Sequence, residues 1–367
     1  MTTLDGDAGL PTVPPSPSSS VPTRRRVLSG RRVGDLFRKS EDHAWRWSAR
    51  AASVIPLVGL AFVVTVLAIK AWPAVKVNGL GFLTSSEWQP GSTYGATVHT
   101  HGVAHPLGAT YGAWPLIAGT LQTSVIAVLL AFPISIGAAF ALTERLPRWV
   151  SRPLGFAVEI LAGIPSVIIG LWGVLVLGPI LARDVYPIVA KQMPDVPVLG
   201  YFRGPAGHGE GLLTSGIVLG LMIVPIITST TRDLFLQVPP LPREGAEALG
   251  MTDAEVARWV TIPWVRSGII GATVLGLGRA LGETIAVAMI TGSILGQVAP
   301  NIYGTMTTIA ATIVSQLDSA ATDGTGFAIA TLAEAGLILA VISVLANLAA
   351  RMIVNRTSRL SAPVGRA

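Results

Sequence analysis

The chain has 367 residues, of which 51% are hydrophobic and 13% charged, and its mean hydropathy is +0.61. Soluble domains usually carry about 25% charged residues, so this composition excludes an ordinary soluble protein and indicates a membrane protein. The sequence has no cysteine, which excludes disulfide bonds, thiolate metal sites and cysteine nucleophiles.

The first 45 residues differ in composition from the rest. Residues 10–32 read LPTVPPSPSSSVPTRRRVLSGRR, a segment rich in Pro and Ser and then basic, with too little apolar material to pack a core. We predict a disordered cytoplasmic tail over residues 1–45 and a membrane domain over residues 46–360.

Six stretches are long and apolar enough for the roughly 20 residues that a membrane-spanning helix needs. They are residues 51–72, 116–142, 154–181, 212–231, 267–294 and 327–350. Pro133 and Pro165 are predicted to interrupt the second and third, as membrane helices tolerate when neighbouring groups satisfy the freed carbonyls. The fold class expected is an all-α membrane protein with six transmembrane helices.

The distribution of basic residues predicts the orientation. If both termini are cytoplasmic, 20 of the 26 Lys and Arg residues lie on the inner side and five on the outer side, and Arg279 lies within a span. Inner loops carry the excess of Lys and Arg, so both termini are expected in the cytoplasm. The tail arginines then suit anionic lipid headgroups better than nucleic acid.

Three of the five histidines, His99, His101 and His105, lie in the long outer loop over residues 73–112. Their spacing matches no established metal site and no acidic residue is adjacent. We expect them to be solvated, with no metal bound.

Four ionisable residues lie within the predicted spans: Glu159, Arg279, Glu283 and Glu334. An intramembrane charge costs about 2.5 to 3.5 kcal/mol even on the insertion scale, so each needs a reason. Arg279 lies 13 residues after Arg266, which predicts a position near mid-membrane. Glu159 and Glu334 lie nearer the predicted boundaries, where water or a polar partner is expected to satisfy them.

The guanidinium of Arg279 suits an oxyanion, and Glu283 at i+4 would lie on the same helix face. Two interpretations stay open from these residues alone. Arg279 and Glu283 could form a site on an anion path, or a permanent ion pair that closes the packing of two helices.

Small residues follow one stripe of the fifth span, at Gly271, Gly278 and Gly282. Such a stripe permits close approach of another helix. The fifth span is therefore expected at a helix interface.

The loop between the fourth and fifth spans, residues 233–266, is charged and patterned like two short helices. Thr252 is the expected N-cap of the second, with Glu255 as its capping-box partner. Such local organisation predicts that another protein docks here, and we call residues 233–266 the docking loop.

The docking loop resembles the EAA loop of the membrane subunits of ATP-binding-cassette importers, which reads E-A-A, three residues, G, nine residues, I-x-L-P. The corresponding residues are Glu244, Gly245, Ala246, Gly250 and, at the end, Pro263, with Val260 and Ile262 as conservative exchanges. The resemblance implies a type I importer permease fold whose loop inserts into a groove of a cytoplasmic ATPase. Gly245 replaces an alanine and should weaken the short helix.

Three further segments are similar to the permeases of the high-affinity phosphate importer, and most to the first of its two homologous permeases. They read LGLGRALGETIAVAMITG, AGIPSVIIGLWG and YGAWPLIAGTLQTSVIAVLLAFPISIGAAFALTE. The resemblance implies that Arg279 and Glu283 belong to the polar pair on the phosphate path, in the cytoplasmic (inner) membrane of a prokaryote.

The same resemblance implies the partners: a second homologous permease, two copies of a cytoplasmic ATPase, and an extracytoplasmic phosphate-binding protein. The chain has no GxxxxGK[ST] motif and no Gly-Lys pair, so it lacks a P-loop for ATP. No cofactor is expected in this chain, and ATP and Mg²⁺ would be bound by the partner ATPase.

Other functions remain open from the sequence. The motif RALGE also occurs in importers of sulfate-type oxyanions, so sulfate or molybdate is an alternative cargo. A secondary anion transporter would show inverted repeats and need no docking loop. A membrane enzyme would need clustered His, Asp or Arg at one membrane face, which only the loop histidines approach.

Overall fold

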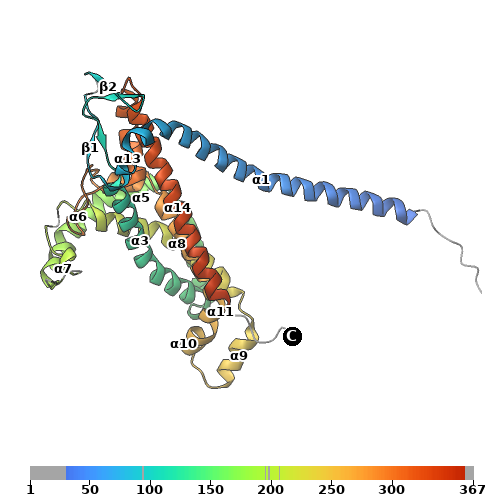
Figure 1. Cartoon of the computed structure of the whole chain (residues 1–367). Helices are drawn as coiled ribbons and strands as arrows, with labels where there is room; N and C mark the ends of the chain where they lie inside the picture. Colours follow the sequence, from blue (N-terminus) through green and yellow to red (C-terminus); the bar gives the residue numbers. More distant parts are fainter. Residues whose placement is uncertain (1–29, 93–94, 195, 197–198, 206, 360–367) are drawn as a thin grey trace, which may run out of the picture. The chain divides into compact units, whose positions relative to one another are not determined.

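The computed structural model describes residues 30–359 except 93–94, 195, 197–198 and 206. Most of the described residues are helical (Figure 1). The α-helices are α1 (Gly30–Asn78), α2 (Gly81–Thr84), α3 (Trp114–Phe140), α4 (Arg148–Ala162), α5 (Ser166–Trp172), α6 (Gly178–Ile180), α7 (Tyr186–Gln192), α8 (Leu212–Leu236), α9 (Pro240–Ala248), α10 (Asp253–Val256), α11 (Ile262–Gly282), α12 (Ile285–Ile290), α13 (Ile309–Ala321) and α14 (Phe327–Arg359).

Short strands and turns join these helices. Two antiparallel two-stranded sheets pair β1 (Trp88–Gln89) with β4 (Thr110–Tyr111) and β2 (Thr97–Thr100) with β3 (Val103–Pro106). The π-helical turns are η1 (Ala141–Arg145), η2 (Gly173–Leu177), η3 (Leu181–Val185) and η5 (Ala257–Thr261), and η4 (Leu199–Phe202) is a 3₁₀ turn. The expected all-α class is therefore corrected to mostly helical, because the loop before α3 forms these two sheets.

The chain divides within α1 into two units, Met1–Ala61 and Phe62–Ala367. In the first, apolar side chains such as Ile55 and Leu57 are exposed, as expected of a surface that faces lipid. Residues 30–45 of the predicted tail are helical and belong to α1. This part lacks the prolines of residues 11–22 that would break a helix. The rest of the predicted tail, residues 1–29, lies outside the described residues.

Six helical segments among the described residues have the length and hydropathy of membrane spans, which confirms the predicted number. They are Arg50–Asn78, Trp114–Arg145, Ser166–Gln192, Leu212–Leu236, Asp253–Gly282 and Phe327–Val354.

The third span differs from its prediction because the chain breaks before Pro165. The helix α4 ends at Ala162, and Pro165 has the extended backbone of an N-cap (φ −57°, ψ 134°) before α5. Proline lacks an N–H and disfavours helix in the residue before it. The apolar residues of α4 therefore precede the span, which begins at Ser166. Pro133, by contrast, lies inside α3 without interrupting it, against expectation.

The fifth span is also not the continuous helix predicted over residues 267–294. Helix α11 ends at Gly282, Glu283 is extended (φ −70°, ψ 129°), and α12 begins at Ile285. After this break Ala286 and Ile290 are buried against α5 and η2, where the Cα of Ala286 lies 2.8 Å from a Cβ placed on Gly170. Tertiary packing of α12 thus replaces the continuation of α11.

Helices α3, α8, α11 and α14 pack in sequence as neighbours in the second unit. The side of α3 that packs inward is made of small residues, including Gly119, Ala127, Ala131 and Ala139. Small residues allow close helix approach in membranes. At Gly119 an added Cβ would lie 2.1 Å from the Thr307 carbonyl oxygen, so only glycine fits there.

Three buried hydroxyls on α3 are satisfied within the helix. Thr120 donates to the Leu116 carbonyl, Thr123 to Gly119 and Ser124 to Thr120, each over 2.7 Å. This bonding to the preceding turn lets polar residues lie in an apolar interface.

The two ends of the second unit differ. Figure 1 shows the sheets and α13 at one end and the docking-loop helices α9 and α10 at the other. At the first end, Phe82, Trp88, Tyr111 and Phe327 belong to one buried cluster. Near the docking loop, a separate buried cluster joins Ala139, Phe235, Val238, Val265 and Ile269. The docking loop is thus attached to a packed base formed by α3, α8 and α11.

Candidate functional site

The docking loop forms two short helices, as predicted. The helix α9 ends in a Schellman arrangement, in which Met251 N–H donates to the Ala246 carbonyl (3.2 Å) and Gly250 N–H to Glu247 (2.9 Å). Gly250 has φ +84°, the left-handed backbone that this termination requires and that glycine adopts most readily.

The predicted cap of α10 is confirmed. The Glu255 carboxylate accepts hydrogen bonds from the N–H and the hydroxyl of Thr252, each at 2.8 Å. From α10 the chain continues through the π-helical turn η5 into α11, and Pro263 is the second residue of α11.

The docking loop presents its predicted residues on two sides. Glu244 and Gly245 are exposed, and a Cβ on Gly245 would meet no atom within 4 Å. Ala246 is buried, and Pro263 is half-buried. The expected contact residue Glu244 is therefore free to meet another protein, whereas Ala246 holds α9 onto its own chain.

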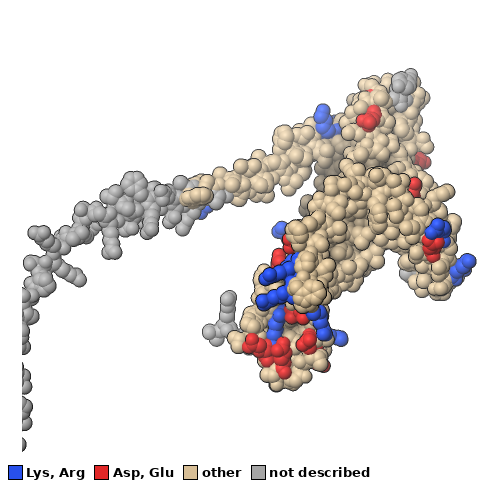
Figure 2. Space-filling view, turned by 180° about the vertical axis from the view of Figure 1, so that it is seen from behind, with Lys and Arg blue, Asp and Glu red and all other residues tan. Residues whose placement is uncertain are grey.

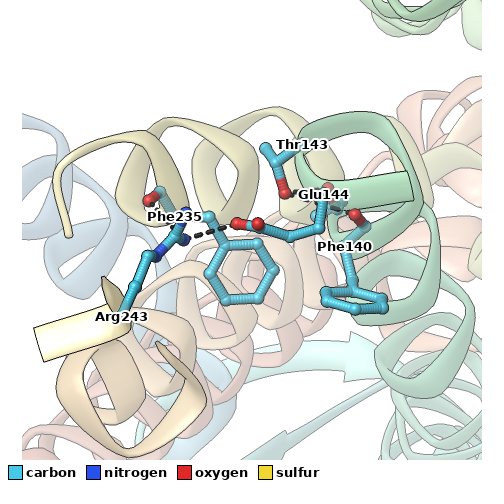
Figure 3. A network of polar contacts seen from close by, with 6 residues as sticks. Phe140, Thr143, Glu144, Phe235 and Arg243 are labelled. Atoms are coloured by element: carbon cyan, nitrogen blue, oxygen red, sulfur yellow. Dashed lines mark hydrogen bonds and ion pairs between the residues drawn. The ribbon is translucent and has the colours of Figure 1, made fainter. Parts of the chain in front are cut away.

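Charged side chains gather at the end of the second unit that carries the docking loop (Figure 2). Two of them reach across to the turn η1 at the end of α3: Arg243 of α9 donates through Nη2 to Glu144 Oε1, and Asp253 Oδ2 lies 3.6 Å from Arg145 Nη1. Figure 3 shows Arg243 and Glu144 pointing toward each other beside Phe235. Sequence reasoning missed both pairs, and the only available signal was the Glu-Arg pair at the end of the second predicted span.

A cavity of about 200 Å³ adjoins this contact, lined by Glu144, Arg243, Glu247, Asp253, Val256, Ala257 and Thr261. Arg243 Nε is buried and has no hydrogen-bond partner within the described part of the chain. The contact is therefore polar and only partly filled.

The second candidate region is the break between α11 and α12. Arg279 lies in the last turn of α11 and is exposed, and Glu283 is the half-buried residue that ends the helix. Arg279 therefore lies at the end of a helix and not in its middle. A positive charge is favourable there because it interacts with the unpaired backbone carbonyls of the last helical turn. Thr284 donates through Oγ1 to the Gly282 carbonyl at 3.1 Å.

The expected i, i+4 pairing of Arg279 with Glu283 is wrong. Because Glu283 is extended, the two residues do not share a helix face. In the described residues neither side chain has an ion pair or a hydrogen bond. The structure therefore does not support the interpretation of Arg279 and Glu283 as a permanent ion pair that closes helix packing.

The predicted glycine stripe makes no close contact with the described residues of this chain. A Cβ on Gly271 or Gly282 would meet no atom within 4 Å, and one on Gly278 would lie 4.0 Å from Asn347 Oδ1. The close approaches of α11 lie instead at Gly268 and Gly276, where an added Cβ would come within 2.6 Å of Leu234 and 2.9 Å of Ile227. Gly271 and Gly282 are therefore exposed on the surface of the chain.

The two remaining intramembrane carboxylates have polar partners, as predicted. Glu334 is buried and accepts from Asn78 Nδ2 at 2.9 Å, and Glu159 forms an ion pair with Arg232 at 3.2 Å. Glu159 lies on α4, however, and so precedes the third span instead of lying within it.

The loop histidines are not all solvated. His99 and His101 are exposed, but His105 is buried. Its Nε2 lies 2.8 Å from Thr100 Oγ1, and its ring centroid lies 5.4 Å from that of Phe327. The expectation is therefore wrong for His105, which lies in β3 and packs against Phe327 at the start of α14.

Comparison with known proteins places these features in context. Residues 131–359 match the family model described as binding-protein-dependent transport system inner membrane component. A protein of Mycobacterium tuberculosis called phosphate transport system permease protein PstC 1 is 59% identical over 335 residues, which cover 91% of this chain and 98% of that protein.

A more distant relative, the phosphate transport system permease protein PstC of Mesorhizobium japonicum, is 41% identical over 86% of this chain and 90% of its own length. Among solved structures, an inward-facing conformation of the MetNI methionine ABC transporter is 19% identical, with a TM-score of 0.46 over 67% of this chain and 94% of that one.

Proposed function

Because the chain belongs to the family of binding-protein-dependent transport system inner membrane components, we propose that it is the permease subunit of an ATP-driven importer of inorganic phosphate. The observation that carries this proposal is 59% identity over 91% of the chain to a phosphate transport permease. It is a multi-pass inner-membrane subunit and not an enzyme. ATP and Mg²⁺ bind to the partner ATPase.

The docking loop suits this role. The C-terminus of α9 and the N-terminus of α10 are both capped, and Glu244 is exposed while the nearby Ala246 is buried. In the proposed complex, two copies of a cytoplasmic ATPase bind this loop and that of a second, homologous permease. Both termini are then cytoplasmic, and the permease fold is of type I.

The opposite end of the unit, with the two small sheets and α13, receives phosphate from an extracytoplasmic binding protein. ATP binding opens the path toward that side, and hydrolysis returns it toward the cytoplasm. Membrane lipid surrounds the exposed apolar helix faces, and no nucleic acid takes part.

Arg279 and Glu283 are the proposed residues of the phosphate path. Irregular backbone at membrane depth is tolerated where it is buried in protein or lines a water-filled cavity, which supports placing the path at the break after Gly282. The exposed guanidinium offers a planar set of donors for phosphate oxygens, and no pairing with Glu283 competes with it.

We predict that Arg279→Gln lowers phosphate uptake at limiting phosphate by about 10- to 100-fold, because a hydrogen bond to a charged group contributes about 1.5–3 kcal/mol and 1.4 kcal/mol corresponds to tenfold. Arg279→Lys keeps the charge but loses the planar fork, so an intermediate loss is expected. Glu283→Gln tests the carboxylate in the same assay.

The measurement is uptake of labelled phosphate by cells whose variants are shown to reach the membrane, with sulfate and molybdate as competitors. Arg183→Gln is the matched control, because among the described residues Arg183 pairs only with its exposed neighbour Asp184. Unchanged uptake by Arg279→Gln would remove Arg279 from the path. Inhibition of labelled phosphate uptake by an equal concentration of sulfate or molybdate would contradict phosphate as the specific cargo.

A further inference from the structure

The turn η1 carries two adjacent charged residues that reach the two helices of the docking loop. Glu144 binds Arg243 of α9, and Arg145 lies 3.6 Å from Asp253 at the start of α10. The partners are far apart in sequence, since Glu144 and Arg243 are separated by 99 residues. One end of α3 is thus tied to both helices of the loop.

The two ion pairs differ in strength. The side chains of Glu144 and Arg243 are only 23% and 22% exposed, and Arg243 Nη2 also lies 3.4 Å from the Phe235 carbonyl oxygen that accepts from it. Arg145 and Asp253 are 51% and 71% exposed, so solvent screens their attraction. Removing one member of a partly buried pair leaves the other charge uncompensated. The contact between α9 and α3 therefore depends mainly on Glu144 and Arg243.

The chain itself connects the docking loop to α8 and α11 but not to α3. Only Gln237, Val238 and Pro239 separate α8 from α9, and α10 continues through η5 into α11. Helix α3 receives no such covalent link. It meets the loop through the ion pairs from η1 and through apolar packing, in which Ile136, Ala139 and Phe140 belong to the cluster around Phe235 and Val238.

Arg243 directly precedes Glu244, the exposed residue proposed to meet the ATPase. A displacement of α9 therefore moves the Arg243 guanidinium, and a directional charged hydrogen bond passes that displacement to Glu144 at the end of α3. Helix α3 packs along α8 and also contacts α11, which carries Arg279 in its last turn and ends before Glu283.

We infer that the Glu144–Arg243 pair is the joint that transmits movement of the docking loop to α3, and that it couples ATP hydrolysis to transport. The inference rests on the proposed function. Both side chains are positioning residues: they face the inner part of the loop and leave the exposed Glu244 untouched. Loss of this ion pair should therefore leave ATPase binding and ATP hydrolysis unchanged but reduce the phosphate imported for each ATP hydrolysed.

The test uses the complete complex in proteoliposomes, with its second permease, ATPase and binding protein. The quantity measured is phosphate imported per ATP hydrolysed. For Glu144→Gln and Arg243→Gln we expect this ratio to fall at least about fivefold, the lower end of coupling between linked sites. ATPase co-purification and the rate of ATP hydrolysis should stay close to those of the unaltered complex.

A charge exchange separates coupling from simple loss of structure. The double variant Glu144→Arg with Arg243→Glu restores opposite charges across the contact and should recover most of the ratio, and Glu144→Asp should lie between. Asp253→Asn should change the ratio little because its pair is exposed. The control Arg183→Gln removes an ion pair that lies outside the docking loop.

If Glu144→Gln and Arg243→Gln both leave the ratio of phosphate imported to ATP hydrolysed unchanged, the inference is overturned. This includes the case in which import and hydrolysis fall by the same factor. A ratio that the charge exchange fails to recover also overturns it. If instead the unaltered complex hydrolyses ATP but imports no phosphate, the proposed function fails and not the joint.

Discussion

Individual polar side chains inside the apolar helices need hydrogen-bond partners from other parts of the chain. Asn78 and Glu334 illustrate the point, because Glu334 is only 5% exposed and Asn78 Nδ2 donates to its carboxylate at 2.9 Å. Buried polar groups are tolerated when they are hydrogen-bonded and costly when they are not. This bond explains how a carboxylate is held within the sixth span.

The Asn78–Glu334 bond is testable by removing the donor. Asn78→Ala should lower the free energy of unfolding by about 1–3 kcal/mol, the cost of leaving a buried acceptor unsatisfied. The measurement is the unfolding midpoint of the purified protein. Glu87→Ala is the control, because Glu87 is exposed at the same end. Equal midpoints for the two variants would show that Asn78 does not satisfy Glu334.

At the scale of elements, the docking loop shows how short helices are stabilised by their ends. Glycine occupies two positions in it with opposite consequences: Gly245 lies inside α9 with open space around it, whereas Gly250 terminates α9 with φ +84°. Glycine weakens a helix interior but is favoured in the left-handed backbone. The two glycines therefore respond differently to the same substitution.

Gly245→Ala should raise the free energy of unfolding of the loop by about 0.5–1 kcal/mol, and Gly250→Ala should lower it by about 1–2 kcal/mol. Protection of the α9 amides against hydrogen exchange measures both effects locally. Opposite signs are the essential expectation. A stabilising Gly250→Ala would mean that the loop does not end α9 in the left-handed conformation.

At the scale of the whole molecule, Gly271 and Gly282 of the glycine stripe on α11 are exposed and have open space around them. Gly271 is exposed, and a Cβ there would meet no atom within 4 Å, whereas one at Gly268 would lie 2.6 Å from Leu234. One face of the same helix thus packs inside the chain, and the exposed face around Gly271 is the one that the proposed second permease would meet. A substitution at Gly271 can therefore test assembly with a partner separately from the folding of this chain, which a substitution at Gly268 would affect.

We predict that Gly271→Leu reduces co-purification of the second permease without lowering the unfolding midpoint of this subunit, because the added side chain blocks close helix approach only at the outer face. Gly268→Leu is the comparison and should lower the midpoint itself. Normal recovery of the partner with Gly271→Leu would place the interface on another face.

The number of spans was predictable because lipid requires a continuous apolar helix that satisfies its own backbone. The third span was misplaced because Pro165 acts as a boundary, while Pro133 is absorbed within α3. The fifth was extended too far because residues 285–290 are as apolar as α11 itself. The expected Arg279–Glu283 pair failed for the same reason, since it assumed one continuous helix.

The sequence by itself determined the membrane class, the six apolar spans and the capped helices of the docking loop, because each depends on hydrophobicity or on hydrogen bonds between residues a few positions apart. Only the tertiary structure decided that α11 ends at Gly282, that Asn78 satisfies Glu334 and that Glu144 meets Arg243. These features depend on which distant segment lies alongside, and the packing of α12 on α5 overrides the local helical pattern.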